Sequence, residues 1–161
     1  MKKVFICLFT CFVFAGAHAQ NTWTGTWSLV SVDNIYPDGT RQHPYGDRPA
    51  GMLVFDEKGN YAIQILRAVR AKIVSGDKNT ATPEEYKNMV EGSNSHFGTY
   101  TVAEDSKTIS FRITHAFFPN WEGTEQKRKY TFKDGVLTYV VTHTTQGGQS
   151  VIAEVSWKKI P

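Results

Sequence analysis

The sequence predicts an all-β fold, either a barrel or a sandwich, with one short helix. Over most of the 161 residues, β-branched and aromatic residues alternate with polar ones in a period of two, which is the pattern of strands with one buried face. Turn-forming residues interrupt this pattern at short spacing. One segment carries the start and stop signals of a helix.

Eight segments have the strand pattern. They cover residues 25–34, 51–56, 61–67, 96–103, 108–116, 125–133, 136–143 and 150–158. Residues that close a turn or tolerate positive φ separate many of them, namely Lys58-Gly59-Asn60, Asp105-Ser106, Asp134-Gly135 and Gly147-Gly148. Because the connections are short, we expect consecutive strands to be antiparallel neighbours.

The predicted helix covers residues 83–91. Thr82 is a suitable N-cap, Pro83 suits the first helical position, and Glu85 completes a capping box with Thr82. Gly92 is a suitable end. The apolar side chains share one face, which could lie on a barrel wall or across an opening: Tyr86, Met89 and Val90.

The sequence predicts a signal peptide followed by one domain. Residues 1–19 combine basic Lys2 and Lys3, an apolar run and small residues before Gln20, which is the form of a cleaved secretory signal. The apolar run is shorter than the roughly 20 residues of a membrane span, so we expect no transmembrane segment after cleavage. Residues 20–161 then form an exported domain, periplasmic or secreted, whose oligomeric state stays open.

Charge and cysteine content narrow the function classes. Without Lys2 and Lys3, 16 basic residues remain against 15 acidic ones, and this balance argues against a nucleic-acid partner. Both cysteines, Cys7 and Cys11, lie in the signal, so the mature domain depends on its core rather than on disulfides. We find no nucleotide-binding or nucleophile motif and no local metal motif, and we expect no cofactor and no metal.

Several short motifs resemble one family. Gly25-Thr26-Trp27 resembles the Gly-x-Trp signature of lipocalins. The wider match comprises His43-Pro44-Tyr45-Gly46, Pro49-x-Gly51, Gln64 with Arg67, Thr82-Pro83-Glu84-Glu85-Tyr86, Phe97-Gly98-Thr99-Tyr100, Phe118-Pro119-Asn120-Trp121 with Gly123-Thr124, and Gln126 with Arg128. Together these resemble the bacterial and fungal lipocalin-like domain family of the calycin type. The resemblance implies an eight-stranded antiparallel up-and-down barrel with an internal cavity, and it implies no reaction. Where relatives often have Thr-Val-x-His in the fifth strand, this chain has Phe111 at the histidine position.

Arg128 is the main candidate for ligand recognition. On its predicted strand it shares a face with Gln126, Tyr130 and Phe132, so alternation places it in the barrel or near its mouth. A buried arginine needs a carboxylate, a ring of hydrogen-bond acceptors or an anionic ligand. The alternatives are an ion pair with a protein acid and a solvent-facing strand end. The candidate acids are Glu125, Glu154 and Asp56.

Other polar residues complete the predicted ligand site. Tyr45 lies in the long connection 35–49, which could cover a barrel mouth, as could the connection 68–82. Gln64 and Arg67 have opposite parity, so only one of them can point inward in a regular strand. The full set of predicted ligand-binding residues is Tyr45, Gln64, Arg67, Phe118, Trp121, Gln126 and Arg128.

An aromatic segment follows the fifth strand. Pro119-Asn120 suits a turn, so Phe117 and Phe118 should approach Trp121. These rings could plug the barrel end opposite Trp27, which we prefer, or wall an apolar pocket.

Two residues beside these rings are candidates for acid–base chemistry. His115 shares parity with Phe111 and Ile113 and could be a general base, although a structural role is the alternative. Glu122 could have a raised pKa beside Trp121 or be solvated.

Three functions remain open from the sequence. The first is an exported barrel that binds a small, largely apolar or amphipathic molecule. The second is an isomerase or cyclase that uses His115 or Glu122 to move a proton and Arg128 to stabilise charge. The third is a structural module with a filled barrel. A void near Arg128 distinguishes the first two functions from the third.

Overall fold

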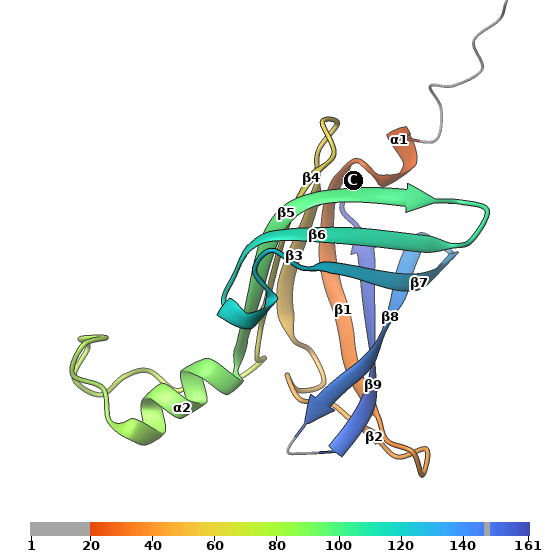
Figure 1. Ribbon diagram of the computed structural model, residues 1–161. Coiled ribbons are helices and arrows are strands. Elements are labelled where there is room, and N and C mark those ends of the chain that lie inside the picture. Colours follow the sequence, from red (N-terminus) through yellow and green to blue (C-terminus); the bar gives the residue numbers. More distant parts are fainter. Residues whose placement is uncertain (1–19, 147–148) are drawn as a thin grey trace, which may run out of the picture.

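The computed structural model describes residues 20–146 and 149–161, and it shows a closed β-barrel (Figure 1). The predicted signal peptide, both cysteines and the Gly147-Gly148 turn lie outside the described residues. The barrel strands are β1 (Gly25–Ile35), β3 (Ala50–Phe55), β4 (Asn60–Leu66), β5 (Ser93–Ala103), β6 (Thr108–Ala116), β7 (Glu125–Lys133), β8 (Val136–Gln146) and β9 (Gln149–Lys159). Each pairs antiparallel with the next, and β9 pairs with β1 to close the barrel. The eight-stranded up-and-down barrel is therefore confirmed.

Four further elements accompany the barrel. The helix α2 (Pro83–Glu91) has the predicted bounds and the predicted capping box between Thr82 and Glu85. Three elements were not predicted: α1 (Gln20–Trp23), the two-residue strand β2 (Arg41–Gln42) and the 3-10 helix η1 (Pro119–Trp121). β2 folds back on the end of β1.

Aromatic residues fill the end of the barrel beside α1. Trp27 is fully buried, and its indole N–H donates to the Trp23 carbonyl at 3.0 Å. Trp23 in turn donates to Glu104 Oε1 at 3.0 Å, while the Tyr130 hydroxyl donates to Glu104 Oε2 at 2.6 Å. Packing of these rings and the hydrogen bonds among them close this end. The other end of the barrel is left for a cavity.

A β-bulge interrupts the pairing of β5 with β6. Phe97 faces His115, whereas Gly98 faces Ile113, so Thr114 is the extra residue. A Cβ at position 98 would collide with the Arg112 carbonyl oxygen; glycine is therefore required there. The bulge shifts the inside–outside alternation of β6 by one residue.

The helix α2 lies beside the open end of the barrel and away from α1 (Figure 1). None of its residues is buried. Among the described residues, no helix is both long enough and apolar enough to cross a membrane.

Candidate ligand cavity

The open half of the barrel holds a cavity of about 440 Å³, within the range of roughly 300–1,000 Å³ that is usual for small-molecule sites. Its apolar wall consists of Val32, Ile63, Ile65, Trp121, Val141, Ala153 and Val155. Its uncharged polar side chains are Asn34, Tyr45, Asn94, His96, Gln126, Tyr139 and Thr142, its charged ones are Glu91, Lys127 and Arg128, and Pro44 completes the lining. The void that a filled structural module would lack is thus present beside Arg128.

Arg128 lies deep in this cavity. Alternation along β7 places it inside with Tyr130, and only 5 % of its surface is exposed. Its guanidinium carbon lies 4.7 Å from the ring centres of both Phe111 and Tyr139. These contacts are cation–π interactions, which favour a cation that has lost its water. The histidine-to-phenylalanine departure at position 111 therefore supplies one face of the arginine site.

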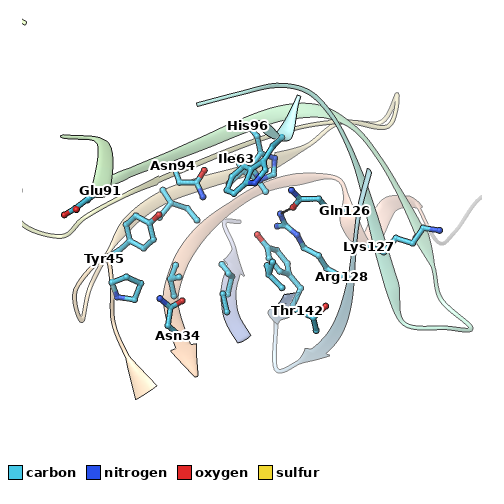
Figure 2. A pocket seen from close by; sticks show the side chains of 18 residues that line it. Asn34, Tyr45, Ile63, Glu91, Asn94, His96, Gln126, Lys127, Arg128 and Thr142 are labelled. Carbon is cyan, nitrogen blue, oxygen red and sulfur yellow. Dashed lines mark hydrogen bonds between the residues drawn. The ribbon is translucent and has the colours of Figure 1, made fainter. Parts of the chain in front are cut away.

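The hydrogen bonds of the Arg128 guanidinium are incomplete. Nη2 donates to Gln126 Oε1 at 2.7 Å, and in Figure 2 these two side chains point toward each other while Lys127 points away. Nε is buried and has no acceptor among the described residues. Arg128 lines the cavity, and its guanidinium has more donors than this one hydrogen bond uses, so it can also bind a group that enters the cavity.

Within the described part of the chain, no carboxylate forms an ion pair with Arg128. Glu125 pairs with Arg112 and Lys127 on the outside, at 3.8 and 3.5 Å. Glu154 pairs with Arg41 at 3.0 Å. Asp56 accepts hydrogen bonds from the following turn. The three acids considered as structural partners are therefore all engaged elsewhere.

His96, which was not predicted as a site residue, lies near Arg128 in the cavity wall. It is buried, and its Nδ1 lies 2.8 Å from the Tyr61 hydroxyl. Burial, with a further contribution from the Arg128 charge, lowers the pKa of His96 to about 3. Burial also raises the pKa of Tyr61. Both groups are therefore neutral near pH 7, and the positive charge in this region belongs to Arg128.

Alternation along β5 could have identified His96, because it shares parity with the aromatic Tyr100. Its proximity to Arg128 could not be inferred in this way, because the two residues lie on strands that are not neighbours.

Tyr45 and Asn94 lie together at the cavity mouth (Figure 2). Burial raises the pKa of the Tyr45 hydroxyl, and a hydrogen bond with Asn94 and the charge of Arg67 partly oppose this shift. The Tyr45 loop is fixed on both sides: the Tyr45 carbonyl accepts from the Ala68 N–H at 2.8 Å, and the preceding His43 contacts Asp33 at 2.6 Å.

The aromatic segment contributes one wall rather than a plug. The Trp121 ring lines the cavity and meets the His96 ring edge-on at 5.9 Å. Phe118 packs against Trp121 from the other side, and about half of its surface is exposed. Phe117 is similarly exposed. Neither phenylalanine enters the core, so these rings do not plug the barrel end, which was the preferred prediction. The segment instead forms one wall of the pocket through Trp121.

His115 and Glu122 lie on the outer surface. The β6 bulge reverses the side to which His115 points, so the expectation that it shares a face with Ile113 was wrong. His115 Nδ1 lies 3.3 Å from Glu122 Oε1, and the same oxygen accepts from the Ala116 N–H at 3.2 Å. Both side chains are largely solvated, and neither lines the cavity.

Four of the predicted ligand-binding residues line the cavity: Tyr45, Trp121, Gln126 and Arg128. Gln64 is exposed on the outer face of β4. Arg67 follows that strand and lines a separate groove beside α2. Among residues 20–146 and 149–161, no three His, Cys, Asp or Glu side chains are arranged to hold a metal ion.

The match to a family model agrees with this architecture. A search of curated proteins found no match. Among solved structures, a lipocalin-like protein from Bacteroides uniformis ATCC 8492 is similar, with 16 % identity, a TM-score of 0.44, and coverage of 86 % of this chain and 99 % of that one. The sequence pattern of the lipocalin-like domain matches residues 24–160. Since this match spans all the barrel strands, the chain belongs to the lipocalin-like domain family.

Proposed function

We propose that this protein is an exported carrier that binds a small, largely apolar molecule with a carboxylate or another planar oxyanion at one end. The observation that carries the proposal is Arg128, whose buried guanidinium faces a cavity and has no carboxylate partner among the described residues. Charged side chains are seldom buried without a partner. A ligand oxyanion would accept from the guanidinium and restore the missing charge pair.

The cavity walls fit the remainder of such a ligand. Aliphatic side chains from four strands surround the space above Arg128, including Ile63, Val141 and Val155. Burying apolar ligand surface against them contributes about 25 cal/mol per Å². The polar groups then orient the ligand, with its anionic end at Arg128 and its other end toward Tyr45 and Asn94 at the mouth.

The geometry favours binding over catalysis. An isomerase or cyclase needs a proton-transfer group within reach of the substrate, but His115 and Glu122 lie outside the cavity. His96 lines it, yet its pKa of about 3 makes its neutral ring a poor base near pH 7.

Binding can be tested with a matched pair of probes, decanoate and decan-1-ol, which share an apolar chain and differ in charge. We expect decanoate to bind at least about tenfold more tightly in isothermal titration calorimetry, because only decanoate pairs with the guanidinium. The Arg128→Met variant should lose this preference. The Arg112→Met variant, which removes an exposed arginine of the neighbouring strand, should keep it. Equal affinities of the wild type for the two probes would contradict the proposal.

Native mass spectrometry of the protein purified from its own host should identify the natural ligand. The expected species is a monoanion that Arg128→Met no longer retains. The proposal of export rests on residues 1–19, and N-terminal sequencing of the protein from the cell envelope or medium should begin at Gln20.

A further inference from the structure

The segment from Arg67 to Glu91 forms an arm beside the open end of the barrel (Figure 1). None of its residues from 68 to 91 is buried. Local hydrogen bonds order it: Glu85 Oε1 accepts from the Val74 N–H at 2.8 Å, and the Tyr86 hydroxyl donates to the Lys78 carbonyl at 2.9 Å. Because the apolar side chains of this ordered segment are not buried, they are available to a partner.

The first part of this arm, residues 67–74, is both basic and apolar. Its sequence is Arg67-Ala68-Val69-Arg70-Ala71-Lys72-Ile73-Val74, with three cations and no acid. Val69 is 82 % exposed and Val74 is 95 % exposed, although aliphatic residues usually avoid water. In the part of the chain that the structure describes, none of the three cations forms an ion pair.

A groove of about 250 Å³ separates this segment from α2. Arg67 and Arg70 line it together with the apolar Val69, Ile73 and Met89. The acid that faces the groove is Glu85, whose two oxygens accept hydrogen bonds from the Val74 N–H and from the N–H and hydroxyl of Thr82. The guanidinium groups of the groove are thus left for an external anion.

We propose that residues 67–74 dock the open end of the barrel on an anionic phospholipid surface. Lysine and arginine near such a surface each contribute about 1 kcal/mol, and the exposed valines can enter the boundary between headgroups and acyl chains. The groove would receive a lipid phosphate, for which arginine provides forked donors. Charge complementarity therefore favours a membrane as the occupant.

A protein partner fits this segment less well. Protein interfaces are usually anchored by large aromatic side chains inserted in a pocket of the partner, and residues 67–74 include no aromatic residue. A lipid surface needs no such shape match. Docking here would also bring the cavity mouth, where Glu91 and Tyr45 lie, close to a source or acceptor of apolar ligands.

Vesicle flotation tests the docking directly. The protein is expected to bind vesicles that contain phosphatidylglycerol and not vesicles of phosphatidylcholine alone, and salt should weaken the binding. The double variant Arg70→Glu/Lys72→Glu should lower the partition coefficient by more than about tenfold. Val69→Ser/Val74→Ser, which leaves the charge unchanged, should also lower it.

The matched control is Lys133→Glu/Lys158→Glu, which makes the same charge change at two exposed lysines of the barrel strands β7 and β9. This variant should float as the wild type does, and thermal melting should confirm that all variants are folded. An equal loss in the control would overturn the proposal, because net charge alone would then explain binding. Equal binding to both vesicle types, or binding to neither, would overturn it as well. None of these substitutions touches the cavity, so the result is independent of ligand binding.

Discussion

Arg128 combines two properties that oppose each other in a folded protein: its guanidinium is buried, and within the described chain no carboxylate neutralises it. The rings of Phe111 and Tyr139 and the amide of Gln126 compensate part of the lost hydration. The part of the lost hydration energy that is not compensated destabilises the barrel in the absence of ligand. Residues kept for binding often reduce stability in this way, so stability and ligand preference should separate on substitution.

The Arg128→Met variant without ligand is therefore expected to be as stable as the wild type or up to about 2 kcal/mol more stable, since a buried charge is replaced by an apolar chain of similar length. Urea unfolding measures this difference. A structural arginine would behave in the opposite way, and a loss of more than about 2 kcal/mol on substitution would exclude the binding role argued here.

His96 should make the barrel sensitive to acid. Its pKa is lowered from 6.5 to about 3 in the folded protein, so below about pH 6.5 the unfolded chain binds a proton that the native state does not. The contribution of neutral His96 to the free energy of unfolding is fully present above the pKa that this histidine has in the unfolded chain. It is lost as the pH falls toward 3. The expected slope from this residue is about 1.4 kcal/mol per pH unit.

Chemical denaturation of the wild type and of His96→Gln across this range measures the contribution of His96. The variant should lose stability less steeply as the pH falls. In NMR spectra, the ring protons of His96 should not shift until the pH approaches the value of about 3. A midpoint near 6.5 would show that the ring is solvated and would contradict the buried, neutral histidine described above.

At the scale of secondary structure, α2 is a helix held by its ends rather than by a core. Its capping box is complete, with the Thr82 N–H donating to Glu85 Oε2 at 2.7 Å and the Glu85 N–H donating to the Thr82 hydroxyl at 3.3 Å. None of its residues is buried. Local opening of the helix therefore costs little apolar burial and can occur without opening the barrel.

Thr82→Ala should destabilise α2 locally by about 1 kcal/mol and leave the melting temperature of the barrel unchanged. Hydrogen exchange should show faster exchange at the amides of residues 83–91 and unchanged exchange in β5 and β6. Thr99→Ala, at an exposed position of β5, serves as the control for a threonine outside a cap. A lowered global melting temperature in Thr82→Ala would mean that the arm is part of the main cooperative unit.

The secondary structure and the inward-facing residues were only partly predictable from the sequence. Alternation located the barrel strands and placed Arg128 and Gln126 on the row that lies in the barrel or near its mouth, because residues on one strand share a face for geometric reasons alone. It misplaced His115 because a bulge resets the alternation. Gly98, an isolated glycine within a strand, was the local sign of that bulge.

The missing partner of Arg128 could not be inferred in this way. Whether Glu125 or Glu154 reaches the guanidinium depends on the side of the barrel wall on which each carboxylate lies and on the cations beside it. Those cations, Arg112 and Arg41, come from other parts of the chain. Non-local pairing of this kind is set by the register of the closed sheet, which is fixed only when β1 and β9 meet.

At the scale of the whole molecule, the barrel is divided into a packed half and a hollow half. The packed half contains the fully buried Trp27, Leu137 and Trp157 and supplies the close packing on which stability depends. The hollow half contains the cavity at Arg128. Side chains such as Ile63 line that cavity and have fewer neighbours on one side. They therefore gain less dispersion energy than equally buried residues that do not line the cavity.

Two isoleucines of similar burial make this division testable. Ile109 is fully buried and is not part of the cavity lining, whereas Ile63 is 3 % exposed and lines the cavity. Ile109→Ala should cost about 2–5 kcal/mol of unfolding free energy, and Ile63→Ala should cost at least about 1 kcal/mol less, because the second change enlarges an existing void instead of creating one. Saturating decanoate should then raise the cost of Ile63→Ala and leave that of Ile109→Ala unchanged, since only Ile63 contacts the cavity. Equal costs in the absence of ligand would show that the open half is as closely packed as the closed one, and binding inside the barrel would lose its physical basis.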